Sequence, residues 1–345
     1  MDTINVPTLI YATENKQRQR EPERVGWVDA VKGIGIILVV VGHCLMEADA
    51  LHNWIYSFHV PLFFIMSGYL SGSRYENGHI PSMAECRHFA KKKLSTYLYP
   101  YLTFSALSLL WYIVFFQILG NTHQENLTTV VLKMVTTYGH NANWFLPALY
   151  WTCVISFCTR RAGRSRPLII GCMAFVGCIA AALVCTLPIF YDRQCYILRY
   201  VFRIMIAVSF EYIGEMIYRG LKICSERTEW LILVFCGTIS VGLFWLNPDV
   251  SLFAIRIHNW FLFYLLALSG SLFIILLCKC TILARNRMLA FLGCHSLIIM
   301  ALHMEFPKEL GWVLVGITKL PRFVPLSFAS ICVGIVACAV SALCA

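Results

Sequence analysis

Residues 31–44, VKGIGIILVVVGHC, decide the class of fold. The stretch is almost wholly apolar, and with its neighbours it approaches the ~20 apolar residues that a membrane-spanning helix needs. It nevertheless holds Lys32 near one end and His43 near the other. Ionisable side chains inside a membrane span are costly and point to a functional site. The stretch therefore predicts a membrane helix that carries functional groups.

The whole chain has the composition of a membrane protein. Of its 345 residues, 59% are hydrophobic and 13% are charged, which is about half the charged fraction of a soluble domain. Ten apolar runs predict membrane-spanning helices, at 28–46, 54–71, 97–117, 143–158, 167–188, 196–218, 230–246, 259–279, 288–305 and 323–344. Because no alternating short strands occur, we expect an all-α, polytopic helical bundle.

The distribution of basic residues predicts the orientation. If the N-terminus is cytoplasmic, the inner segments hold 19 of the 28 Lys and Arg residues and the outer loops hold 6. This positive-inside bias favours an N-in, C-in topology. Residues 1–26 are polar and lack a signal peptide, so we expect a cytoplasmic tail, followed by a transmembrane domain over 27–345. The net charge of +10 then reflects topology and indicates no nucleic-acid partner.

The 16 cysteines predict neither a disulfide framework nor a metal site. Most lie inside apolar runs, without a CxxC pair or a zinc-like spacing. A buried cysteine behaves as a small hydrophobic residue. We therefore expect packing residues and no bound metal.

Polar residues of the first helix form a stripe. Asp29 and Lys32 have i,i+3 spacing, and His43 follows Lys32 by eleven residues. Eleven steps return to within about 20° of the same helix face, about 16 Å further along. The stripe could link the cytoplasmic side to a histidine in the outer half. Alternatively, Asp29 and Lys32 form an interfacial ion pair and His43 is a hydrogen-bonded packing residue.

Other polar residues are predicted at the same outer depth as His43. With His43 they come from five predicted helices, and they comprise His59, Asn143, Trp144, Arg199, Arg203 and His303. This agreement in depth predicts one cavity that opens to the outside. For Trp144 an interfacial aromatic anchor is the alternative. The inner half of the sixth helix holds Glu211 and Glu215, which either line a polar cavity or belong to an ion-pair network with its arginines.

Four blocks of sequence resemble one family. RVGWVDAVKGIGIILVVVGH followed by FHVPLFFIMSGYL is similar to the opening of the acyltransferase-3 family of integral-membrane O-acyltransferases. NANWFLPALY and FLGCHSLIIMALH resemble two later segments of that family. Length and character look closest to the fucose O-acetylase-like subgroup. Lysine stands at position 32 where many members have arginine, which keeps the charge but loses the planar fork.

The resemblance implies transfer of an acyl group, commonly acetyl, from cytoplasmic acyl-CoA to a hydroxyl of a cell-surface glycan or glycolipid. It implies a multi-pass protein of the plasma membrane, with acyl-CoA as a substrate and no bound cofactor. His43 is then expected to be the general base, with an acyl-histidine as the variant, and Lys32 to assist it. CoA phosphates would bind Arg87, Lys91, Lys92 and Lys93, although this basic run is also explained by topology alone. Acceptor-binding residues would be His59, Asn143, Trp144, Arg203 and His303.

Two rival interpretations remain. The buried charges of the sixth helix also suit a transporter or flippase of a small polar solute or glycan. A non-catalytic membrane sensor would need only that His43 be dispensable. Dependence on acyl-CoA separates the enzyme from both.

Overall fold

The computed structural model describes residues 26–45, 49–75, 79–114, 126–139, 141–186 and 196–304. Within these ranges the chain is helical, apart from loops and a single bridge between Ser251 and Arg256. The α-helices are α2 (Gly26–Cys44), α3 (Ala50–Tyr56), α4 (His59–Arg74), α5 (Met83–Lys93), α6 (Tyr99–Tyr112), α7 (Leu127–Val135), α8 (Phe145–Thr159), α9 (Arg166–Thr186), α10 (Tyr196–Ile223), α11 (Glu226–Leu243), α12 (Trp260–Cys280), α13 (Arg287–Cys294) and α14 (Ser296–Leu302). The all-α prediction is therefore confirmed for this part of the chain.

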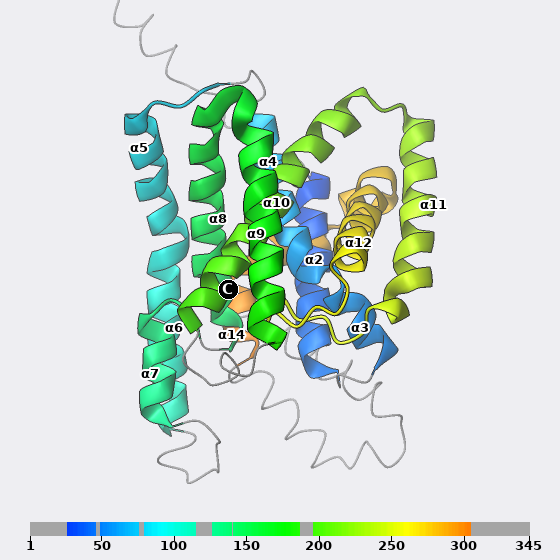
Figure 1. The fold of residues 1–345 in the computed structure, drawn as a ribbon. Helices are drawn as coiled ribbons and strands as arrows, with labels where there is room; N and C mark the ends of the chain where they lie inside the picture. The colour runs from blue at the N-terminus through cyan, green and yellow to red at the C-terminus, as the bar shows by residue number, and fades with distance from the viewer. Residues whose placement is uncertain are drawn as a thin grey trace, which may run out of the picture.

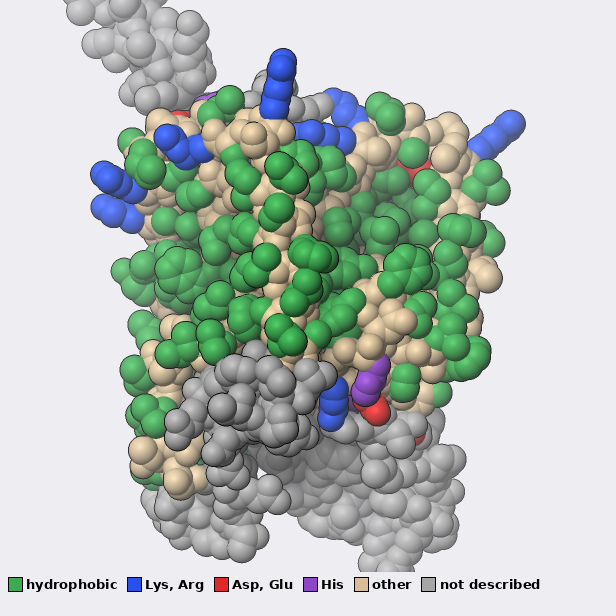
Figure 2. Space-filling model, in the orientation of Figure 1, with side chains coloured by type: hydrophobic (Ala, Val, Ile, Leu, Met, Phe, Trp, Pro, Cys, Tyr) green, Lys and Arg blue, Asp and Glu red, His purple; other side chains and the backbone are tan. Residues whose placement is uncertain are grey.

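Most helices lie side by side in one bundle (Figure 1). The central helices α2, α4, α10 and α12 lie between α5, α6 and α7 on one side and α11 on the other (Figure 1). Four described stretches are long and apolar enough to cross a membrane: Gly26–Cys44, Ala142–Leu183, Glu226–Leu246 and Trp260–Cys280. On the face drawn in Figure 2, apolar side chains cover the middle and Lys and Arg gather mainly at the upper end. This is the surface of a membrane protein.

The predicted spans match the helices with three differences. The span 54–71 is broken, because Ser57 Oγ donates to Trp54 O at 2.7 Å and a new helix begins at His59, with Pro61 in its first turn. The span 97–117 begins earlier, since α5 continues through the π-helical turn Leu94–Leu98 into α6. The span 288–305 is broken at His295, whose Nδ1 donates to Phe291 O at 2.8 Å. The last predicted span, 323–344, lies outside the described residues.

The described part of the segment between the third and fourth predicted spans forms the short helix α7. It is capped by Asn126, whose side chain accepts a hydrogen bond from Thr129 N. Among the described side chains, Cys86, Cys153, Cys158, Cys172, Cys178, Cys224, Cys236, Cys278 and Cys280 are not joined by disulfide bonds. Cys86, Cys153, Cys236 and Cys278 are buried, as expected of cysteines that serve as packing residues.

Two helix pairs approach so closely that only glycine fits between them. On α4 and α10, a Cβ added at Gly68 would stand 1.8 Å from Glu211 O, and one added at Gly214 would stand 2.0 Å from Ile65 O. On α2 and α13, a Cβ at Gly293 would stand 1.8 Å from Asp29 O. Small residues allow such approach, and in membranes dispersion contacts replace the hydrophobic drive between helices. These contacts hold α4 and α13 against the polar helices α10 and α2.

The α4–α10 contact gives a test of the packing. Gly214→Ala is expected to destabilise the protein by about 1–3 kcal/mol or more, because the new methyl group meets backbone. Gly220→Ala on the same helix meets nothing within 4 Å and is expected to be neutral or stabilising by up to about 1 kcal/mol, as alanine favours helix. Thermal unfolding of both variants in detergent measures the difference. Equal melting temperatures would contradict the close packing.

Candidate functional site

Two histidines at the ends of helices far apart in sequence are hydrogen-bonded to each other. His43 ends α2 and His303 follows α14, and His43 Nδ1 lies 2.8 Å from His303 Nε2. The rings are nearly parallel, with centroids 5.0 Å apart and planes at 19°. His303 is fully buried, whereas His43 is partly exposed. The structure therefore brings together two of the histidines that the sequence places at one depth.

His59 completes the cluster from α4. Its ring lies edge-on to that of His43, with centroids 6.4 Å apart, and its Nδ1 donates to Ile55 O at 2.9 Å. The Tyr56 ring lies beside both, with its centroid 4.7 Å from that of His59 and 6.0 Å from that of His43. Imidazole is the side chain best suited to accept a proton near neutral pH. The cluster thus has the chemistry of a general base.

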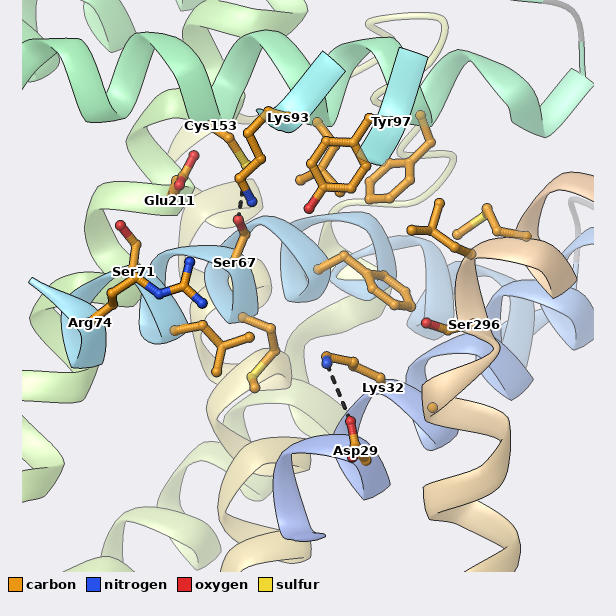
Figure 3. A pocket seen from close by; sticks show the side chains of 18 of the residues that line it. Asp29, Lys32, Ser67, Ser71, Arg74, Lys93, Tyr97, Cys153, Glu211 and Ser296 are labelled. Carbon is orange, nitrogen blue, oxygen red and sulfur yellow. Dashed lines mark hydrogen bonds and ion pairs between the residues drawn. The ribbon is translucent and has the colours of Figure 1, made fainter. Parts of the chain in front are cut away.

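A separate cavity of about 290 Å³ lies beside the opposite half of α2. Three cationic side chains line it: Lys32 from α2, Arg74 from the end of α4 and Lys93 from the end of α5 (Figure 3). Lys32 Nζ also lies 3.3 Å from Asp29 Oδ1, so these two residues form an ion pair, which the alternative interpretation of the stripe also expects. Three converging cations favour an anionic ligand, with phosphate oxygens as good partners for such donors.

Polar groups also line the wall formed by α4, α8 and α10 (Figure 3). Ser67 Oγ lies 3.2 Å from Cys153 Sγ, and Tyr97 and Glu211 line the same space. Glu211 is 2% exposed, and its Oε2 has no hydrogen-bond partner among the described residues. A buried carboxylate oxygen without a partner is costly, so a ligand group that donates a hydrogen bond would be stabilised here.

A short segment of α14 connects the cavity wall to the histidine pair. Met300 lines the cavity from α14, and its carbonyl accepts a hydrogen bond from His303 Nδ1 at 2.9 Å. Phe63 and Phe145 line the cavity as well, and their rings lie 5.7 Å apart. One helical turn therefore separates the cavity wall from the histidine pair.

The predicted basic run divides in two. Lys93 lines the cavity and lies over the rings of Phe89 and Tyr97, at 5.4 and 5.1 Å from their centroids. The side chains of Arg87, Lys91 and Lys92 are exposed and do not line this cavity. Arg74 lines it instead, although the sequence indicates only a loop charge there. The signal for Arg74 is its helical register with Ser67 and Ser71 on α4, seven and three residues earlier.

Arg203, Trp144 and Asn143 are buried within the protein. The Arg203 guanidinium is fully buried, 4.4 Å from the Trp144 ring centroid and 4.9 Å from that of Phe253, and donates to Phe253 O. Asn143 Nδ2 donates to Ser108 Oγ at 3.0 Å. One side of the Trp144 ring is thus covered by Arg203, and the ring is buried and not an exposed aromatic anchor.

Glu215 belongs to a buried ion-pair cluster. It lies 2.8 Å from Arg160 Nη2, and Arg166 approaches both of its carboxylate oxygens, at 2.7 and 2.8 Å. The predicted network therefore exists, but its arginines come from the α8–α9 connection. Neither Arg199 nor Arg203 takes part in it among the described ion pairs. The partners differ because Arg199 and Arg203 lie three to four turns away from Glu215 along α10.

Comparison with known proteins identifies the kind of domain. The model of a family described as an acyltransferase domain matches residues 25–344. No curated protein matches the chain, and no solved structure does.

Proposed function

Because the chain belongs to the acyltransferase-3 family and is a membrane acyltransferase, we propose that it transfers an acyl group from cytoplasmic acyl-CoA to a hydroxyl of an extracytoplasmic carbohydrate. Acetyl is the first donor group to consider, from acetyl-CoA. The observation that carries the proposal is the cavity lined by three cations, one helical turn from a histidine pair. An anionic donor on one side and a proton acceptor on the other are what this reaction needs.

The proposed arrangement in the plasma membrane has ten spans, with both termini in the cytoplasm. The bias of Lys and Arg in the sequence and their concentration at the upper end in Figure 2 support it. That end carries the start of α5, whereas α3 and α7 lie at the other (Figure 1). The three-cation cavity would then open toward the cytoplasm and the histidines would face outward.

The donor is proposed to enter with its phosphates beside Lys32, Arg74 and Lys93, while the exposed Arg87, Lys91 and Lys92 attract it to the surface. The cavity is smaller than a whole CoA molecule, so the nucleotide would remain near the mouth. The extended pantetheine arm spans about 15–20 Å, which is comparable with the ~16 Å between Lys32 and His43 along α2. The thioester would therefore reach the histidines.

In the proposed reaction, a ring nitrogen of His43 takes the proton of the acceptor hydroxyl as its oxygen attacks the thioester carbonyl carbon. The carbon–sulfur bond breaks, and the CoA thiolate leaves and is protonated to the free thiol. A new ester remains on the acceptor. A positioned base of this kind contributes about 10²–10⁴-fold. The residues proposed to shape the acceptor side are His59, Asn143, Trp144 and Arg203. Trp144 would contact the acceptor through the edge of its ring, because Arg203 covers one face.

The donor site gives a direct test. Arg74→Gln and Lys93→Gln are each expected to raise the KM for acetyl-CoA by about 10-fold or more, because each removes a charged hydrogen-bond donor from the phosphates. Steady-state release of free CoA by purified protein measures this. Arg227→Gln, an exposed charge on α11, is the matched control and should leave KM unchanged. An unchanged KM in both cavity variants would contradict the assignment of this cavity to the donor.

The buried charges of α10 support a transport function less well than the cavity and the histidine pair support acyl transfer. Glu215 is neutralised by two arginines and is fully buried, which makes it a structural element. A solute or proton path needs charged groups that change partners. Glu211, whose Oε2 lacks a partner among the described residues, is the group that best suits a transport function. Consumption of acetyl-CoA distinguishes acyl transfer from transport.

A further inference from the structure

The hydrogen bonds of His303 define where its proton lies. Its Nδ1 is 3.1 Å from Ile299 O and 2.9 Å from Met300 O. Carbonyl oxygens only accept hydrogen bonds, so Nδ1 must carry a hydrogen. In the neutral ring Nε2 then has the lone pair. His303 therefore presents an acceptor, and not a donor, to the histidine that it faces.

This assignment determines the tautomer of His43. His43 Nδ1 lies 2.8 Å from His303 Nε2, so the hydrogen of this bond comes from His43 when both rings are neutral. The lone pair of His43 is consequently on Nε2. A general base needs its lone pair on the nitrogen that meets the acceptor hydroxyl, and the wrong tautomer is inactive.

We propose that His303 is a positioning residue that holds His43 in the Nδ1–H tautomer, with Nε2 as the basic nitrogen. The inference rests on the proposed acyl transfer, which it extends by naming the basic atom and the group that orients it. The backbone of α14 fixes His303, and His303 in turn fixes the ring at the end of α2.

The same bond would assist the chemical step. When His43 Nε2 takes up the hydroxyl proton, its ring becomes a cation and the bond from Nδ1–H to His303 becomes charge-assisted, hence stronger. Among the described residues, the rings of Tyr56 and His59 also lie near His43. His59 donates its Nδ1 hydrogen to Ile55 O, so its Nε2 is likewise an acceptor in the neutral ring.

Binding of the acceptor sugar is a less suitable role for His303. Its side chain is fully buried, and both ring nitrogens are engaged by the protein, one by backbone and one by His43. A residue that binds a sugar needs a polar atom directed to the ligand. The proposal thus moves His303 from the acceptor-binding set to the support of His43.

The experiment combines spectroscopy that needs no substrate with kinetics. Protein labelled with ¹⁵N in its histidine rings is compared with His303→Phe, His303→Gln and the control His258→Gln, an exposed loop residue. His43 resonances, assigned with His43→Gln, are expected to report the Nδ1–H tautomer in the wild type and in the control. In His303→Phe they should shift toward the Nε2–H form that a free histidine side chain prefers. His303→Gln supplies a carbonyl acceptor and should retain part of the signature.

Kinetics with acetyl-CoA and a mixture of simple methyl glycosides gives the second readout. We expect His303→Phe to lower kcat by about 10–100-fold with little change in the KM for acetyl-CoA, and His303→Gln to recover part of kcat. The wild-type spectrum alone overturns the proposal if His43 is mainly in the Nε2–H form, even if the variants fail to fold. A wild-type kcat in His303→Phe also overturns it. A confirmed tautomer without acyl transfer would instead contradict the proposed function.

Discussion

Replacing His43 with alanine is expected to lower kcat for acyl transfer by about 10²–10⁴-fold, with acetyl-CoA binding retained. The imidazole is the proton acceptor of the proposed reaction, whereas Lys32, one of the three cations proposed to bind the donor, lies about 16 Å from it along α2. Release of free CoA and transfer of label from acyl-labelled acetyl-CoA to a glycoside measure the two halves of the reaction. His43→Gln should be equally inactive, since an amide is not a base near neutral pH.

The exposed histidine of the α5 cap provides the matched control. His79 is hydrogen-bonded to Glu85 at 2.9 Å. It is exposed and does not belong to the cluster of His43, His59 and His303. His79→Ala should keep wild-type kcat. Turnover by His43→Ala at the wild-type rate would remove His43 from the chemistry. Loss of acetyl-CoA binding in that variant would show that its effect arises from folding or from the donor site.

Removing the carboxylate of Glu215 is expected to have the largest effect on stability. Glu215→Gln would leave Arg160 and Arg166 buried side by side without a counter-ion, and breaking a buried ion pair in this way costs about 3–5 kcal/mol. The approach of Arg166 to both oxygens, at 2.7 and 2.8 Å, adds directional hydrogen bonds that an amide cannot reproduce. Thermal unfolding in detergent, followed by circular dichroism, measures the loss.

The control for this substitution is an exposed glutamate on the next helix. Glu226→Gln, in the first turn of α11, removes a charge that favours the helix N-terminus and should cost less than about 1 kcal/mol. A melting temperature in Glu215→Gln that equals that of Glu226→Gln would show that the cluster contributes little. The double variant Arg160→Met with Glu215→Gln should recover part of the loss, because it removes one of the two stranded cations.

The sequence was sufficient for the features that depend on periodicity. The Lys32–His43 stripe, the Asp29–Lys32 pair and the common depth of His43, His59 and His303 all follow from helical spacing and from the alternation of spans. In the structure His43 is hydrogen-bonded to His303 at 2.8 Å, and the ring centroids of His43 and His59 are 6.4 Å apart. Depth could be predicted because every helix must cross the same apolar layer.

Features that depend on contacts between helices could not be predicted from one sequence. In the sequence Arg160 and Arg166 look like loop charges. In the structure the chain turns at Gly163, with φ of +54°, and both arginines contact Glu215. Arg74 enters the cavity only because α4 packs against α10 through glycines. Trp144 is covered by Arg203, a contact between the turn that precedes α8 and helix α10, for which spacing gives no signal.

The surroundings of Glu211 also depend on contacts between helices. It is buried in the cavity wall, and its Oε2 lacks a hydrogen-bond partner among the described residues. The cavity supplies its environment, since Lys93 lines the same space. A hydrogen-bond donor of the ligand, such as a pantetheine amide, is the group that this carboxylate suits.

Acyl transfer across the membrane is tested most directly by a sided assay in sealed liposomes. Protein is reconstituted with methyl glycosides, including a fucoside, enclosed in the lumen, and acyl-labelled acetyl-CoA is added outside only. The account predicts free CoA outside and labelled ester inside, both lost in His43→Ala. Movement of unmodified glycoside without consumption of acetyl-CoA would contradict it and would favour transport.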